Sequence, residues 1–277
     1  MCAHFPSHSL SALLSQRNPA VRPLRRCLLV LILLLVIAPI RSGLAASPSR
    51  SALQELPSVV LWAWERPEDF RFLRSSNTAV AFLAATLQLH DGQVAIRPRF
   101  QRLLVPDPVK LFAVVRIEVG PHTTLRNEQI AQCVAAIANA AAEPRVVAVQ
   151  IDFDTTSSQR AFYRDLLIAL RQRLGKNVPI SITALASWCF DDDWISGLPI
   201  DEAVPMLFRM GAGANDVVSR VHSGRDFRSP LCRGSLGIST DERWPALFSG
   251  RRLYIFHPHP WTEAAAQEAL WEVHSWR

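Results

Sequence analysis

Eight short runs of β-branched and aromatic residues recur along the chain after residue 57, separated by helix-like or loop-like segments. Strands that alternate with helices are typical of parallel βαβ units, because parallel strands need a long crossover connection. Eight such strands with a helix at the C-terminal end predict an α/β fold, a compact single-domain (β/α)8 TIM-like barrel. The expected strands are 58–64, 79–87, 110–119, 146–153, 180–186, 203–208, 234–238 and 252–256.

Three other segments have the apolar periodicity of helices, namely 127–143, 157–174 and 262–276. Gly175 follows the second of them, where a helix commonly ends. An open doubly wound sheet is the alternative fold. No glycine-rich phosphate loop follows any expected strand, so the sequence favours the barrel.

The first 46 residues have a different character. Arg25 and Arg26 precede an unbroken apolar run at 27–40, and small residues follow it. This order is typical of a secretory signal, and the run is shorter than the about 20 residues that a membrane span needs. We expect a signal peptide or N-terminal membrane anchor over 1–46, a barrel domain over 47–277, and an exported protein, periplasmic or extracellular.

The charge of the chain argues against a nucleic-acid partner. The formal net charge is +6, but five arginines lie within 1–46, where no acidic residue offsets them. About one positive charge therefore remains for 47–277, which is not the basic footprint of a nucleic-acid binder. Membrane contact is expected only through the N-terminal segment. We expect no cofactor and no structural zinc, since the chain has no Cys-x-x-Cys pair.

Three cysteines follow the N-terminal segment. Cys133 lies in an apolar helical stretch and is expected in the core. Cys189 and Cys232 lie at loop edges, and in an exported protein they either form one disulfide or stay free. Because they belong to strand ends of opposite polarity, a bond requires the loop 229–233 to fold over the barrel mouth.

The strand expected at 146–153 ends in two carboxylates, Asp152 and Asp154, which lie two residues apart and therefore point to one side. Active sites of barrels are built at this carboxyl end of the strands. The ends of the other expected strands bring further candidates to the same mouth: Trp64, Glu65, Arg116, Glu118, Trp188, Arg209, Asp241, Glu242, His257 and Trp261. Carboxylates supply the acids, bases and nucleophiles of glycosidic cleavage, and tryptophan rings stack on sugars, so the set predicts a carbohydrate ligand.

Several of these residues have purely structural alternatives. Asp152 or Asp154 either caps the following helix or pairs with Arg116. Glu65 and Glu118 are alternatively ion-paired with Arg66 and Arg116. Trp62 and Trp64 are expected on opposite sides of their strand, with at least one of them in the core.

Four sequence runs resemble the bacterial family called domain of unknown function 3142. They are 59–67, 149–154, 181–189 and 201–211, and the resemblance extends over nearly all of the chain after the N-terminal segment. It implies no established activity.

A fainter similarity is to family 18 glycoside hydrolases, the chitinase-type barrels, whose fourth strand ends in Asp-x-Asp-x-Glu. Asp152 and Asp154 match the two aspartates, but Thr156 stands in the place of the catalytic Glu. Phe208 replaces the tyrosine of that family's sixth strand. These departures remove the acid and a hydroxyl, so the similarity implies a related barrel without the substrate-assisted mechanism.

We interpret the chain as an exported glycoside hydrolase-like protein. In retaining barrels, carboxylates of strands four and seven face each other, which makes Asp154 the acid/base and Glu242 the nucleophile, with Asp152 and Arg209 orienting. One alternative is a saccharide-binding barrel without catalysis. Another is a metal-assisted hydrolase using Asp152, His257 and His259.

Overall fold

The computed structural model describes residues 52–74, 77–243 and 249–275. The chain divides into two units, Met1–Ser49 and Arg50–Arg277, and all described residues lie in the second. The signal or anchor expected over 1–46 therefore lies outside the described residues. Among the helices that are described, none is both long enough and apolar enough to cross a membrane.

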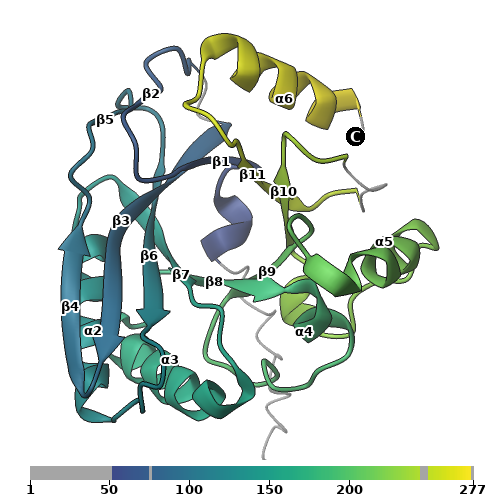
Figure 1. Cartoon of the computed structure of the whole chain (residues 1–277). Helices are drawn as coiled ribbons and strands as arrows, with labels where there is room; N and C mark the ends of the chain where they lie inside the picture. Colours follow the sequence, from purple (N-terminus) through teal and green to yellow (C-terminus); the bar gives the residue numbers. More distant parts are fainter. Residues whose placement is uncertain (1–51, 75–76, 244–248, 276–277) are drawn as a thin grey trace, which may run out of the picture. The chain divides into compact units, whose positions relative to one another are not determined.

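Eight parallel strands close into a barrel (Figure 1). Each pairs with its neighbours in chain order, and β1 closes the ring by pairing with both β3 and β11. The closed ring confirms the (β/α)8 prediction, because an open sheet would leave two barrel strands at its edges. The barrel strands are β1 (Val59–Ala63), β3 (Thr78–His90), β6 (Leu111–Val119), β7 (Val146–Asp152), β8 (Ile180–Leu185), β9 (Glu202–Met206), β10 (Ser235–Ser239) and β11 (Arg252–Phe256).

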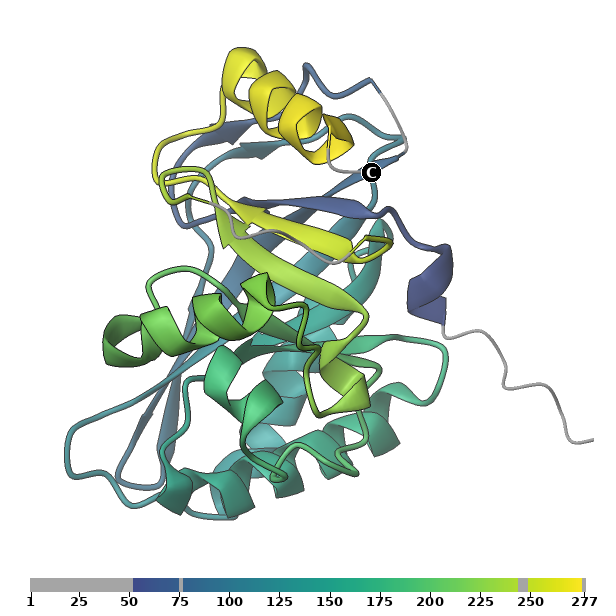
Figure 2. The same ribbon diagram turned by 90° about the vertical axis from the view of Figure 1, so that its right-hand side faces the viewer.

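The helices of the described segments lie outside the strands: α2 (Glu128–Ala141), α3 (Arg160–Leu174), α4 (Ala186–Phe190), α5 (Ala214–His222) and α6 (Glu263–Ser275). Figure 2 shows α6 on one side of the barrel strands and α2 and α3 on the other. The helices α2, α3 and α6 were expected from their periodicity. The sequence did not predict α4 and α5, because α4 spans five residues and α5 buries only Val217 and Val221.

A hairpin replaces the helix that would follow β3. The strand β4 (Gln93–Pro98) pairs antiparallel with the second half of β3. Asp91 and Gly92 connect the two strands with φ angles of 44° and 82°, which a two-residue type I′ hairpin turn requires at both positions. Two shorter strands, β2 (Glu68–Asp69) and β5 (Leu103–Leu104), form a small separate sheet.

The barrel interior is filled by side chains. Phe112 and Tyr254 pack edge to face at 5.9 Å between ring centroids, in one cluster with Trp62. Trp62 Nε1 donates to Gln150 Oε1 at 2.9 Å, and Gln150 Nε2 donates to Ser181 Oγ at 3.1 Å. The buried polar groups thus satisfy one another, and the central barrel is a core rather than a pore.

A buried ion pair lies at the amino-terminal end of the barrel. Arg252 Nη1 is 3.1 Å from Glu202 Oε2, and the two side chains are 8% and 4% exposed. The Tyr254 hydroxyl donates to the other Glu202 oxygen at 2.5 Å. Arg252 also donates to the Leu53 carbonyl, which belongs to the short 3-10 helix η2 (Ala52–Glu55). The ion pair therefore joins the segment before β1 to strands β9 and β11.

Cys189 and Cys232 form a disulfide, with Cα atoms 5.9 Å apart. The loop carrying Cys232 does not cross the mouth, which corrects the expectation from sequence. Its 3-10 helix η5 (Pro230–Cys232) lines a cavity with Ser58 and Arg252, at the amino-terminal ends of the strands. Cys189 lies in α4, and its carbonyl accepts hydrogen bonds from the backbone N–H groups of Arg228 and Ser229, so the chain before η5 packs directly against α4. Cys133 is free and buried, and burial raises the pKa of its thiol to about 12.

Replacing both Cys189 and Cys232 with Ser is expected to destabilise the fold. The bond closes a loop with a sequence separation of 43, for which the chain-entropy estimate is about 4 kcal/mol as an upper figure. Urea denaturation of the oxidised wild type and the double variant measures the difference. A reducing agent should lower only the wild-type midpoint, and intact mass showing three free thiols after residue 46 would contradict the bond.

Arg252→Met is expected to cost about 3–5 kcal/mol of unfolding free energy, because it leaves the Glu202 carboxylate buried without its cation. Adding Glu202→Gln should recover part of that loss, since the unpaired charge is then removed. Tyr254→Phe is the matched control, because it removes one hydrogen bond to Glu202 and keeps the ion pair. Equal losses in the single and double variants would show that the pairing is not what stabilises this end.

Candidate functional site

A cavity of about 530 Å³ opens at the carboxyl ends of β6 and β7. Arg116 of β6 is the register partner of Asp152 of β7, so the pairing of these two strands places the two side chains together. The residues that line the cavity are Arg116, Ile117, Glu118, Val119, Asp152, Phe153, Asp154, Thr156 and Gln159. Four predicted site residues thus meet here: Arg116, Glu118, Asp152 and Asp154.

Asp152 is the most perturbed carboxyl of the cavity. Its side chain is 14% exposed, Thr183 Oγ1 donates to its Oδ1 at 2.9 Å, and Arg116 Nη1 lies 3.6 Å from its Oδ2. Burial raises the Asp152 pKa from 3.8 to about 6, against the opposing effect of Arg116 and with a further raising effect of Asp154. Asp152 therefore keeps a proton to a pH at which ordinary aspartates have lost theirs.

Asp154 lies two residues after Asp152, beyond the end of β7, and its side chain is exposed. The residue that replaces the chitinase-type Glu, Thr156, belongs to the start of the next helix. The Thr156 backbone N–H donates to Gln159 Oε1 at 2.9 Å, and its hydroxyl lies 3.0 Å from the Ser158 hydroxyl. Thr156 therefore has a local capping function, and the carboxyl groups that line the cavity are those of Glu118, Asp152 and Asp154.

The guanidinium of Arg116 contacts both a carboxylate that lines the cavity and the ring of Trp64. Arg116 Nε lies 2.9 Å from Glu118 Oε1, and its carbon Cζ lies 5.2 Å from the centroid of the Trp64 ring. Trp64 and Trp62 both point into the barrel, with ring centroids 5.8 Å apart. The expectation that they face opposite sides is wrong, because residues two apart on a strand share a face.

A second group of predicted residues lies after β9 and β10. Arg209 Nη2 is 2.8 Å from Asp241 Oδ2, and the Arg209 backbone N–H donates to Glu242 at 3.0 Å. Arg209 has a φ of 51°, an uncommon conformation for a residue with a side chain, and its guanidinium lies 5.2 Å from the Phe256 ring centroid. Asp241 and Glu242 do not line the cavity that contains Asp152 and Asp154.

Two predicted sugar-stacking residues are buried, which corrects their assignment. Trp188 and Trp261 are each 4% exposed. Trp188 packs against Trp194 at 4.9 Å between ring centroids, and Trp261 Nε1 donates to the Trp62 carbonyl at 2.8 Å. Neither offers a ring face to a ligand in this structure, because both complete the packing of the core.

Two further predicted residues have structural partners at the rim. His257 Nδ1 lies 2.6 Å from the Thr240 hydroxyl, and burial lowers the His257 pKa. Glu65 Oε2 lies 3.6 Å from Arg97, which is its partner in place of the expected Arg66. Across 52–74, 77–243 and 249–275, no three His, Cys, Asp or Glu side chains are grouped so that they could hold a metal ion. The metal-assisted alternative therefore lacks its site in these segments.

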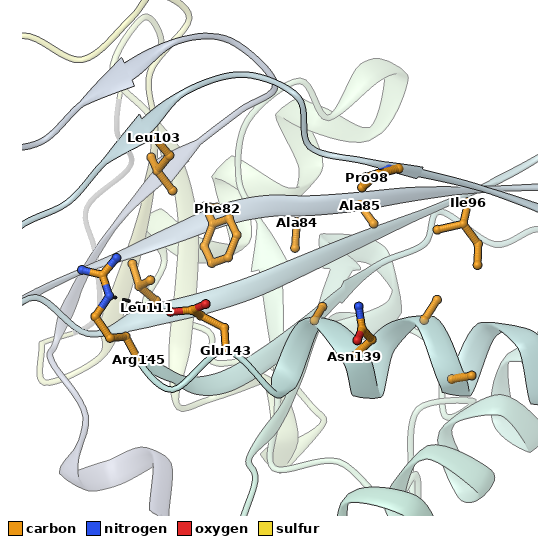
Figure 3. Close-up of a pocket in the computed structure, with 13 residues that line it drawn as sticks. Phe82, Ala84, Ala85, Ile96, Pro98, Leu103, Leu111, Asn139, Glu143 and Arg145 are labelled. Carbon is orange, nitrogen blue, oxygen red and sulfur yellow. Dashed lines mark ion pairs between the residues drawn. The ribbon is translucent and has the colours of Figure 1, made fainter.

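A different concavity of about 610 Å³ lies on the outer face, between α2 and the β3–β4 hairpin (Figure 3). It occupies the position where a helix between β3 and β6 would cover the barrel. Its lining is mainly apolar, including Phe82, Ala136 and Ile96, with Glu143 and Arg145 at one end. This composition provides no acid–base pair comparable to that of the mouth.

Two residues that the sequence analysis did not identify support the site. Thr183 binds Asp152, and Gln88 Nε2 lies 3.4 Å from Glu118 Oε2. Thr183 could have been predicted from the sequence, because counting alternate residues along the expected strand 180–186 shows which of its side chains point inward. Gln88 was not, because a β-bulge between Leu83 and Ala85 shifts the register of β3 against β6.

Comparison with known proteins extends over part of the chain. The family described as "Domain of unknown function (DUF3142)" matches residues 107–225. The match confirms the resemblance over β6 to β9, which carry Arg116, Asp152 and Thr183. The run 59–67 and the pair Asp241 and Glu242 lie outside it.

Among solved structures, one described as "putative Chitinase A from Streptomyces coelicolor" is similar with a TM-score of 0.49 and 10% sequence identity. The alignment covers 79% of this chain and 95% of that chain. A search of curated proteins gave no match.

Asp152→Asn is expected to stabilise the fold at neutral pH. Asp152 has a pKa of about 6 in the folded chain and an ordinary value of 3.8, so the folded state binds its proton more tightly. That stabilising effect is complete below pH 3.8 and is lost as the pH rises to about 6. The loss is of the order of 3 kcal/mol, and the variant escapes it.

Urea denaturation at about pH 4 and about pH 7.5 measures the effect, as the difference in unfolding free energy between variant and wild type. This difference should favour the variant at the higher pH. Asp165→Asn is the matched control, because Asp165 is exposed on α3. A difference that does not change with pH would show that Asp152 does not bind its proton more tightly in the folded state.

Proposed function

We propose that the barrel mouth is a saccharide site and that the protein is a glycoside hydrolase-like enzyme whose proton donor is Asp152. The observation that carries the proposal is a buried carboxyl with a pKa of about 6, next to an exposed carboxylate in an open cavity. Glycosidases use two carboxyl groups in different environments, one that donates a proton and one that acts as base or nucleophile.

The environments of the two aspartates divide these functions. Asp152 is the one that keeps its proton up to about pH 6, so it donates to the oxygen of the leaving sugar. Asp154 is exposed at the cavity, where it accepts a proton from the attacking water. An acid that protonates the leaving oxygen and a base that activates water give inversion of configuration, so this assignment predicts an inverting enzyme. This assignment replaces the expectation of Asp154 as acid and Glu242 as nucleophile.

The mouth also supplies groups that suit a sugar. Glu118, Thr156 and Gln159 line the cavity with oxygen and nitrogen atoms suited to hydroxyls, and Trp64 lies beneath Arg116 next to it. A saccharide-binding barrel without catalysis is the second candidate. It is favoured by Thr156, which stands in the place of the chitinase-type acid and has a capping function.

We also propose that the protein is exported. The Cys189–Cys232 disulfide supports this, because such bonds persist in oxidising compartments. The signal-like sequence at 1–46 supports it independently.

The test is hydrolysis of a polysaccharide panel by the barrel-containing protein, with reducing-end detection and analysis of the product anomer. Activity should fall at least about 100-fold in Asp152→Asn and in Asp154→Asn, because each removes a proton-transfer group. Asp165→Asn should retain it. In the wild type, kcat/KM should decline above about pH 6, as Asp152 loses its proton.

The two candidates give different results. Saccharide binding that weakens in Trp64→Ala, without hydrolysis by the wild type, would support the binding barrel and exclude the enzyme. Neither binding nor hydrolysis across the panel would exclude both. Hydrolysis with retention of configuration would exclude Asp154 as the base.

A further inference from the structure

The guanidinium of Arg116 is shared unequally between two carboxylates. Its Nε lies 2.9 Å from Glu118 Oε1, whereas its Nη1 lies 3.6 Å from Asp152 Oδ2. The first distance is that of a charge-assisted hydrogen bond, and the second is not. Arg116 is thus bonded to the carboxylate outside the catalytic pair, although Asp152 is its register partner.

Two further contacts hold Arg116 in this position. Trp64 lies beneath its guanidinium, with 5.2 Å between Cζ and the ring centroid. Gln88, the register partner of Glu118 on β3, approaches the second Glu118 oxygen at 3.4 Å. The side chains of Arg116 and Glu118 are 37% and 39% exposed, so either residue can be substituted without disturbing the core.

The groups that act on the Asp152 proton come from four elements. Arg116 and Glu118 belong to β6, Thr183 belongs to β8, and Asp154 follows Asp152 beyond β7. From α3, the buried Tyr163 lies close enough for Asp152 and Asp154 to raise the pKa of its hydroxyl, with burial as the larger cause. Arg116 is the cation among them, so its position decides how strongly the charged form of Asp152 is favoured.

We propose that Glu118 is a positioning residue that holds the Arg116 guanidinium away from Asp152 and so leaves the Asp152 carboxyl able to carry a proton. The inference rests on the proposed function for its catalytic consequence, but its physical content is a property of the free protein. Without Glu118, the guanidinium has Asp152 as its nearest described carboxylate partner. A direct bond would stabilise the carboxylate and release the proton at lower pH.

The test is the titration midpoint of the Asp152 carboxyl, followed by NMR in protein labelled with ¹³C at aspartate carboxyls. Glu118→Gln should lower the midpoint by about 1 pH unit, and Arg116→Gln should raise it. Glu118→Asp, which keeps the charge, should lie between the wild type and Glu118→Gln. Glu65→Gln is the matched control, because Glu65 is a rim carboxylate paired with Arg97, and it should leave the midpoint unchanged.

The double variant separates positioning from the direct effect of the Glu118 charge. If Glu118 acts through Arg116, Glu118→Gln should have little effect in the Arg116→Gln background. An equal decrease with and without Arg116 would overturn the proposal, as would an unchanged or raised midpoint in Glu118→Gln alone.

Kinetics then separate this inference from the proposed function. In an active protein, the decline of kcat/KM with pH should move to lower pH in Glu118→Gln, in parallel with the NMR midpoint. Shifted midpoints in a protein that hydrolyses nothing would leave the positioning intact and reject the enzyme. Unshifted midpoints with hydrolysis intact would reject the positioning alone.

Discussion

The pairing of β1 with both β3 and β11 is the constraint on which the site depends. Closure puts all eight carboxyl ends into one ring and makes alternate residues of each strand point inward. Asp152 on β7 lies beside Arg116 on β6 and Thr183 on β8 because these strands are direct neighbours in the ring, and the pairing of β1 adds Trp64 beneath Arg116. The same closure buries the central layer, where Trp62, Gln150 and Ser181 satisfy each other's polar groups.

The protonation state of Asp152 is set by two opposing effects, desolvation of its carboxyl group and the charges and hydrogen bonds of its neighbours. Desolvation favours the protonated form, and Arg116 and Thr183 favour the carboxylate, with a net result near pH 6. The outcome depends on the placement of Arg116, whose Nη1 lies 3.6 Å from Asp152 Oδ2, because a cation in direct contact would lower the pKa by about 1–3 units from where desolvation leaves it. In the positioning that we propose, Trp64 and Gln88 act on Asp152 through Arg116, and Glu118 does so in addition to the direct effect of its charge.

The mouth has two charged groups that differ in character. Near β7, the carboxyls surround an open cavity, and Asp154 remains exposed. Near β10, Asp241 and Glu242 are both bonded to Arg209, whose left-handed backbone costs about 1–3 kcal/mol that its surroundings must offset. The first group is the one to which we assign the proposed proton transfer, whereas the second fixes a loop at the edge of the mouth.

The sequence by itself determined the barrel and the pair of aspartates. The eight strands were readable because each is a short apolar run, and their number and alternation with helices define the fold class. Asp152 and Asp154 were readable because they end such a run. The hairpin turn at Asp91 and Gly92 also had a local signal, although the sequence analysis did not use it.

The tertiary structure decided which of the candidate residues share a site. Trp188 and Trp261 follow expected strands as Trp64 does, yet Trp188 is buried against Trp194 and Trp261 against the β1 segment. The sequence analysis paired Glu242 with Asp154, whereas in the structure the Glu242 carboxylate accepts the Arg209 backbone N–H and does not line the cavity of Asp154. Burial and pKa depend on distances between elements far apart in sequence, and local periodicity carries no information about those distances.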